Sequence, residues 1–148
     1  MAITLFVLQL ASTLIMVGVI WFVQVVHYPL FGRVGEQEFS AYERSHQQRT
    51  GIVVIPPMLV ELATAVAMIA YRPPGTPRWV AVLGLALVAV AWVSTFALQA
   101  PTHGRLSPGF EPGLHRYLVA TNWIRTVAWT ARGGLVCWCC WVMLRAAR

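Results

Sequence analysis

Long apolar stretches that contain almost no charge constrain this chain more than any other feature. The first charged residue is Arg33, and three further stretches of similar length follow it. A helix needs about 20 predominantly apolar residues to cross a bilayer, and each stretch supplies that length. We therefore expect four membrane-spanning helices, at about residues 3–31, 51–71, 79–99 and 114–145. The predicted fold is an all-α, integral membrane, antiparallel four-helix bundle that forms one domain over residues 1–148.

The charged residues are few and mostly arginine, which fits a bilayer better than a nucleic acid. Only 11% of the chain is charged and 58% is hydrophobic, whereas a soluble domain is about 25% charged. All 11 basic residues are arginine, and the net charge is +6. Most of them lie between or at the ends of the apolar stretches, where they suit anionic headgroups. We therefore expect membrane lipid as a partner and no nucleic acid, in a multi-pass protein of a bacterial-type cytoplasmic (inner) membrane whose net charge favours cytoplasmic termini.

The three connections between the apolar stretches differ in character. Residues 33–50 are mostly polar but include Phe39 and Tyr42, which predicts an amphipathic segment that lies on the membrane surface or extends the second helix outward. Residues 72–78 read RPPGTPR and predict a rigid turn. Residues 100–113 hold six prolines and glycines, so a loop is expected there. The sequence alone predicts no internal repeat.

Four ionisable residues lie in the membrane-embedded parts of the predicted spans, namely His27, Glu61, Arg125 and Arg132. Such groups are costly in a bilayer, so each is a candidate functional residue. On antiparallel helices, His27 lies about one turn inside the membrane and Glu61 reaches roughly the middle from the same face. Simpler roles are a packed histidine, an arginine that snorkels to the headgroups and a structural ion pair between Glu61 and Arg132.

Polar side chains recur along one face of the fourth apolar stretch. His115, Asn122, Arg125, Trp129 and Arg132 are separated by seven, three, four and three residues, which is the spacing of one helical stripe. We expect this stripe to face the interior of the bundle. It places two arginines opposite one carboxylate, so an anionic group is expected there. Haem propionates, a phenolate, a quinone oxygen or a lipid headgroup would each satisfy that charge.

All four histidines belong to one end of the predicted bundle. They are His27, His46, His103 and His115. Their spacing matches no zinc template, but a metal site that contains His27 and a loop histidine such as His46, with Glu61 nearby, is sterically plausible. Pro56 and Pro57 interrupt the second helix one turn before Glu61, which frees backbone carbonyls and opens a place for a ligand.

Two pairs of segments resemble known families. WFVQVVHYPLF at residues 21–31 and FSAYERSHQQRTGIVVIPPM at residues 39–58 resemble HemJ-type protoporphyrinogen oxidases, which are small helical membrane proteins thought to bind haem. STFALQAPTHGRL at residues 94–106 and NWIRTVAW at residues 122–129 are similar to anthrone oxygenase-related membrane proteins. The resemblances cover about half of the chain. They imply a compact four-helix membrane protein with a polar site at one end and a lipophilic aromatic substrate.

These observations favour a membrane-bound oxidoreductase, either an oxidase or an oxygenase, that uses haem or a transition metal on a lipophilic aromatic or quinone-like substrate. In this hypothesis His27 ligates the metal or acts as a general base, with His46 as a second metal ligand. Glu61 is the proton acceptor or a second ligand. The residues expected to hold or orient the cofactor or substrate are Gln24, His103, Asn122, Arg125 and Arg132.

Two other functions remain open from the sequence. The first is a non-catalytic membrane subunit that binds a lipid, a pigment or a partner membrane protein, with its arginine stripe paired to that partner. The partner could be a second copy of the chain or a larger membrane complex. The second is a transporter, which four helices support poorly unless the chain forms oligomers.

Overall fold

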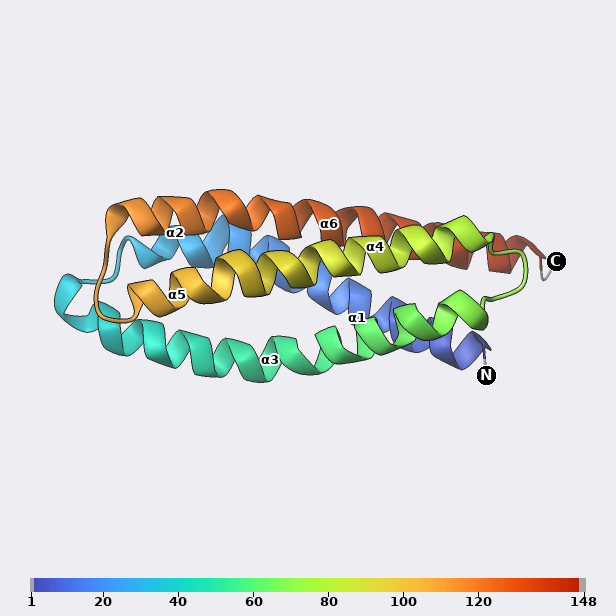
Figure 1. The fold of residues 1–148 in the computed structure, drawn as a ribbon, viewed down its shortest axis with the longest axis horizontal. Helices are drawn as coiled ribbons and strands as arrows, with labels where there is room; N and C mark the ends of the chain where they lie inside the picture. Colours follow the sequence, from blue (N-terminus) through green and yellow to red (C-terminus); the bar gives the residue numbers. More distant parts are fainter. Residues whose placement is uncertain (1, 147–148) are drawn as a thin grey trace.

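The computed structural model describes residues 2–146 and consists of four long helical rods that run side by side (Figure 1). Each rod is long and apolar enough to cross a membrane. The described residues contain no strand, so the predicted all-α, four-helix membrane bundle is confirmed. The elements are α1 (Ala2–Phe22), η1 (Val23–His27), α2 (Tyr28–Phe31), α3 (Glu36–Ala70), α4 (Arg78–Ser94), η2 (Thr95–Gln99), α5 (Ala100–Leu106) and α6 (Pro112–Ala146).

The rods form two helical hairpins. The first and third rods are each interrupted by a single π-helical turn, η1 in one and η2 in the other, while α3 and α6 are uninterrupted and each contain 35 residues. The two termini and the turn between α3 and α4 lie at one end of the molecule (Figure 1). Gly75 adopts a φ of 77° in that turn, a conformation that glycine tolerates without a steric cost. The connections at the opposite end lead directly into the polar site.

The second helix begins at Glu36 rather than near residue 51 as predicted. Of the two predicted alternatives for residues 33–50, the extension of the second helix is the one observed. Glu36 and Glu38 occupy the first turn of α3, where negative charge is favoured by the helix dipole. Phe39 and Glu43 are fully buried, because the polar segment packs its mixed face against the other helices instead of against headgroups.

The predicted loop at residues 100–113 is also wrong over its first half, since the third rod continues as a helix to Leu106. The backbone N–H of Ala100 bonds to the carbonyl of Thr95, which closes a π-helical turn just before Pro101. Proline has no N–H to donate, and the wider turn accommodates this loss without ending the helix. The first rod uses the same device, because η1 ends two residues before Pro29.

The helix α3 is likewise uninterrupted at Pro56 and Pro57, although the sequence predicted a break there.

The bundle core consists of three apolar clusters stacked along its length. The central cluster includes Met16, Ile20 and Trp129, while many large apolar side chains on the outside remain exposed. An apolar outer surface is what lipid requires of a spanning bundle.

Candidate functional site

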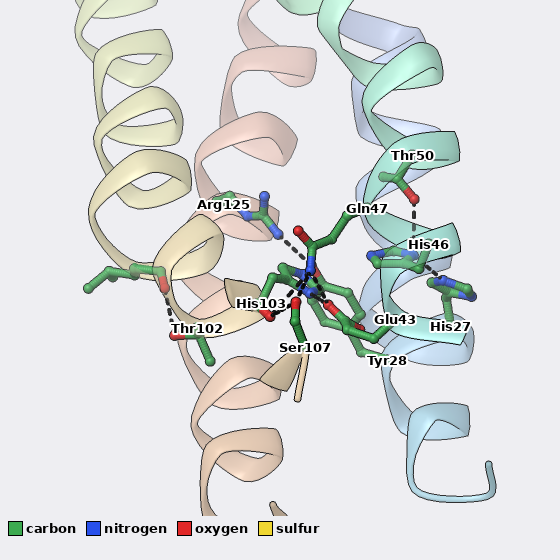
Figure 2. A network of polar contacts seen from close by, with 11 residues as sticks. His27, Tyr28, Glu43, His46, Gln47, Thr50, Thr102, His103, Ser107 and Arg125 are labelled. Carbon is green, nitrogen blue, oxygen red and sulfur yellow. Dashed lines mark hydrogen bonds and ion pairs between the residues drawn. The ribbon is translucent and has the colours of Figure 1, made fainter. Parts of the chain in front are cut away.

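The candidate residues predicted from the sequence separate into two polar clusters. The first, which we call the relay cluster, lies where η1, α2, α3, α5 and α6 meet (Figure 2). Its members are Gln24, Tyr28, Glu43, His103, Asn122 and Arg125. The second, the ion-pair cluster, consists of Thr13, Glu61, Trp129 and Arg132. The sequence grouped its functional candidates into one site, and the structure divides them: Gln24, His103, Asn122 and Arg125 belong to the relay cluster, and Glu61 and Arg132 to the ion-pair cluster.

A chain of hydrogen bonds runs through the relay cluster from Arg125 to Glu43. The Nη2 group of Arg125 lies 3.1 Å from the Tyr28 hydroxyl, which lies 2.9 Å from Nε2 of His103. On its other side, Nδ1 of His103 lies 2.6 Å from Oε1 of Glu43. A carboxylate can only accept, so Nδ1 of a neutral His103 holds the proton and Nε2 accepts one from Tyr28. The chain is thus directed from the Tyr28 hydroxyl toward Glu43.

Arg125 is held in place by neutral groups alone. Its Nε group donates to Oδ1 of Asn122 over 2.9 Å, and Nη1 lies 3.4 Å from the Thr95 hydroxyl. Asn122 is in turn oriented by Gln24, whose Oε1 accepts from its amide over 2.8 Å. Arg125 is 91% buried, and no carboxylate among residues 2–146 lies within ion-pair distance of it. A buried guanidinium in this position is short of one negative charge.

Gln24 lies one turn before His27 in the sequence but does not contact its ring. Gln24 bonds to Asn122 and to the carbonyl of Val119, because the π-helical turn η1 shifts His27 away from the face that Gln24 occupies. His27 contacts His46 instead, with 2.8 Å between Nε2 of His27 and Nδ1 of His46. Nδ1 of His46 also lies 3.0 Å from the Thr50 hydroxyl.

The histidine pair does not fit the metal site that the sequence predicted. Two nitrogens 2.8 Å apart share one proton between them and leave no room for an ion that needs about 2.0–2.1 Å to each. Within the described part of the chain, no group of three or more His, Cys, Asp or Glu side chains is arranged to hold a metal ion. The two facing nitrogens therefore cannot share an ion in this arrangement, and the haem or transition metal expected from the sequence stays a prediction.

The relay cluster borders a cavity of about 450 Å³ between α3 on one side and α4, η2 and α5 on the other. Tyr28, His46, His103 and Arg125 present their polar groups to it. The rest of its wall is largely apolar and aromatic and includes Val54, Ile55, Met58, Leu59, Trp92 and Phe96. A mainly apolar cavity with a few convergent polar groups is typical of a small-molecule site.

Two buried polar atoms in the cavity wall have no hydrogen-bond partner. They are Oε1 of Gln99 and Nε1 of Trp92. Buried polar atoms are rarely left unsatisfied, yet these two residues of the cavity lining each retain a hydrogen-bonding group without a partner. Gln99 was not singled out in the sequence as a ligand-binding group.

The ion-pair cluster is buried and leaves Nη2 of Arg132 without a hydrogen-bond partner. Oε1 of Glu61 accepts from Nε of Arg132 and from the Thr13 hydroxyl, each over 2.7 Å, and Oε2 accepts from Trp129 over 2.8 Å. Nη1 of Arg132 donates to the carbonyl of Gly84 over 2.6 Å. Glu61 and Arg132 are both fully buried, and neither lines the cavity beside the relay cluster. The structural ion pair that the sequence left open is the arrangement observed.

Sequence reasoning missed Tyr28 and Glu43, which form the middle and the end of the relay. A signal for Glu43 was present, because Glu43, His46 and Thr50 are three and four residues apart and so share one helical face. Tyr28 had no comparable signal, since an aromatic residue near a helix end is typical of the membrane interface. His115 lies next to this cluster and bonds to the backbone carbonyl of Tyr28 over 2.8 Å.

Comparison of the chain with protein-family models, curated proteins and solved structures finds no match. The resemblances stated above therefore stay expectations.

Proposed function

We propose that this protein is a membrane-bound oxidoreductase whose cavity binds a lipophilic aromatic substrate with an acidic hydroxyl group, such as a phenol or hydroquinone. The observation that supports this most directly is Arg125, a buried cation without a carboxylate partner that faces the cavity beside Tyr28. A substrate oxygen that becomes negative during the reaction would supply the negative charge that Arg125 lacks. The apolar remainder of the wall suits the aromatic body of such a molecule.

In this proposal the relay cluster removes the substrate proton. The Tyr28 oxygen takes the proton of the substrate hydroxyl while its own proton moves to Nε2 of His103. The resulting imidazolium is stabilised by Glu43 through Nδ1, and the substrate oxyanion is stabilised by Arg125. The arrangement combines a hydroxyl group (Tyr28), a base (His103) and a carboxylate that orients the base (Glu43). The anion is more easily oxidised than the neutral phenol, and an acceptor of the quinone or dioxygen class would take its electrons.

The proposal changes the roles expected from the sequence. The base is His103 acting through Tyr28 rather than His27, and Glu61 belongs to the structural ion pair rather than to the proton path. Gln24 and Asn122 position Arg125. We place the protein in a bacterial-type cytoplasmic membrane with its termini on the cytoplasmic side, because the terminal end of the bundle contains Arg72, Arg78 and Arg145 and no acid in the connecting segments.

The test is turnover of an alkylated naphthohydroquinone by purified protein in lipid nanodiscs, followed by absorbance under air and with an added short-chain quinone. General acid–base catalysis contributes roughly 10²- to 10⁴-fold, so Tyr28→Phe should lower kcat by that factor while the protein remains folded. Tyr71→Phe is the matched control, because Tyr71 is exposed at the other end of the bundle. It should behave as the unaltered protein.

A second measurement separates catalysis from binding. Equilibrium binding of the hydroquinone should weaken in Arg125→Gln and persist in Tyr28→Phe. Binding that depends on Arg125 with no turnover under either condition would overturn the enzymatic proposal in favour of a pigment- or lipid-binding subunit. The visible spectrum and metal content of the same preparation test the haem and metal predictions, with His27→Ala and His46→Ala as the variants that should lose any bound group.

A further inference from the structure

The first hairpin contains a second hollow, which we call the outer groove. It has a volume of about 400 Å³ and lies between α1 and η1 on one side and α3 on the other. His27, Arg49 and Thr50 supply its polar groups. The remaining wall is apolar and consists of Gly18, Val19, Phe22, Val23, Val53 and Val54.

Arg49 differs from Arg125 in its exposure. It is exposed at the surface, and neither of the two ion pairs between described residues includes it. Arg49 is 12 residues from Glu61 along α3, which corresponds to about 18 Å of helix. If Glu61 lies near the bilayer midplane, Arg49 is at the headgroup boundary, about 15 Å from the centre.

The groove extends from this arginine toward the middle of the bilayer. Gly18 lies nine residues before His27 on the first rod, and a Cβ atom added to Gly18 would meet nothing within 4 Å. The apolar wall therefore opens on the outer surface of the bundle, at the depth of acyl chains. A positive group at headgroup depth above an apolar channel complements an acidic amphiphile.

We propose that the outer groove is a binding site for an acidic phospholipid. The phosphate lies against Arg49, with His27 and Thr50 as additional hydrogen-bond partners, and one acyl chain lies along the wall between Gly18 and Val53. The outer groove adjoins the cavity proposed for the substrate, since Thr50 and Val54 line both, while His27 lines only the groove and its partner His46 only the cavity.

The experiment measures binding of phosphatidylglycerol and of phosphatidylcholine to the detergent-solubilised protein by native mass spectrometry. A basic side chain near the membrane surface contributes about 1 kcal/mol, so Arg49→Gln should weaken phosphatidylglycerol binding about fivefold and leave phosphatidylcholine binding unchanged. Arg116→Gln is the matched control, because Arg116 is an exposed arginine at the same end but outside the groove. It should bind phosphatidylglycerol as the unaltered protein does.

A second variant tests the acyl channel without a change of charge. Gly18→Leu should fill the open channel and weaken phosphatidylglycerol binding at least as much as Arg49→Gln does. Equal losses in Arg49→Gln and Arg116→Gln, or full binding by Gly18→Leu, would overturn the proposal. Competition by inorganic phosphate at the concentration of the lipid would also overturn it, because it would show a site for the free anion.

Discussion

The relay cluster and the ion-pair cluster use the same kinds of residue in the same bundle, yet their surroundings differ. Each contains one glutamate, one arginine of α6 and a nearby aromatic donor. In the ion-pair cluster the two charges meet at 2.7 Å, and both carboxylate oxygens are satisfied. In the relay cluster the arginine and the glutamate are separated by Tyr28 and His103.

This difference indicates which of the two buried arginines, Arg125 or Arg132, is available for chemistry. Glu61 and Arg132 neutralise each other directly and lie away from the cavity, so they contribute to the stability of the bundle. Arg125 retains an uncompensated charge beside the cavity of about 450 Å³. The sequence placed both arginines on one interior stripe, and the position of the carboxylates separates their roles.

The largest expected effect comes from breaking the ion-pair cluster. Glu61→Gln leaves Arg132 as a buried charge without its partner, which should cost about 3–5 kcal/mol in the free energy of unfolding. Arg132→Gln should cost a similar amount, and the double variant should lose less than the sum of the two. Unfolding in mixed micelles measures these values, with the exposed Glu38→Gln as the control. Strictly additive losses would show that the two residues are not coupled.

The next effect concerns the end of the relay. Glu43→Gln retains the shape of the side chain but removes the charge that stabilises a protonated His103. Hydrogen bonds to charged groups are worth about 1.5–3 kcal/mol, so kcat for the hydroquinone should fall by roughly 10- to 100-fold with little change in KM. A large loss of thermal stability with little change in kcat would assign Glu43 a structural role. The contrast between Glu43 and Glu61 would then be removed.

The smallest expected effect tests how tightly the ion-pair cluster is packed. A Cβ atom on Gly84 would lie 2.9 Å from Nη1 of Arg132. This guanidinium cannot move freely, because Nε bonds to Glu61 and Nη1 bonds to the carbonyl of Gly84. Gly84→Ala should therefore destabilise the protein by about 1 kcal/mol, at the low end for overpacking. Gly134→Ala is the control, since a Cβ atom there meets nothing within 4 Å. A stabilised Gly84→Ala variant would show that the cluster has room to adjust.

Much of this molecule could be predicted from its sequence. Helix length and charge-free apolar stretches are local properties, so the four spans were correct even though two of their ends were not. The interior stripe of Asn122, Arg125, Trp129 and Arg132 was also correct, because helical periodicity alone places those residues on one face.

The pairing between helices could not be read in the same way. Glu43 lies 60 residues from His103, and Tyr28 lies 97 residues from Arg125. Nothing local in the sequence indicates which carboxylate meets which arginine, so Glu61 was grouped with the histidines and Glu43 was left in a surface segment. The π-helical turns were a second obstacle, since they change which residues share a face after Val23 and after Thr95.

The most direct test compares Arg125→Gln with Arg132→Gln in one preparation, with hydroquinone affinity and thermal stability measured for both. The two residues lie on the same helix, two turns apart, and the substitution is identical. We expect Arg125→Gln to lose substrate affinity by about tenfold or more, as for a charged hydrogen bond, while its melting temperature stays near that of the unaltered protein. Arg132→Gln should show the opposite pattern, a large loss of stability with the affinity of the folded fraction retained. If Arg125→Gln mainly unfolds the protein and Arg132→Gln mainly weakens binding, the assignment of the two clusters is reversed.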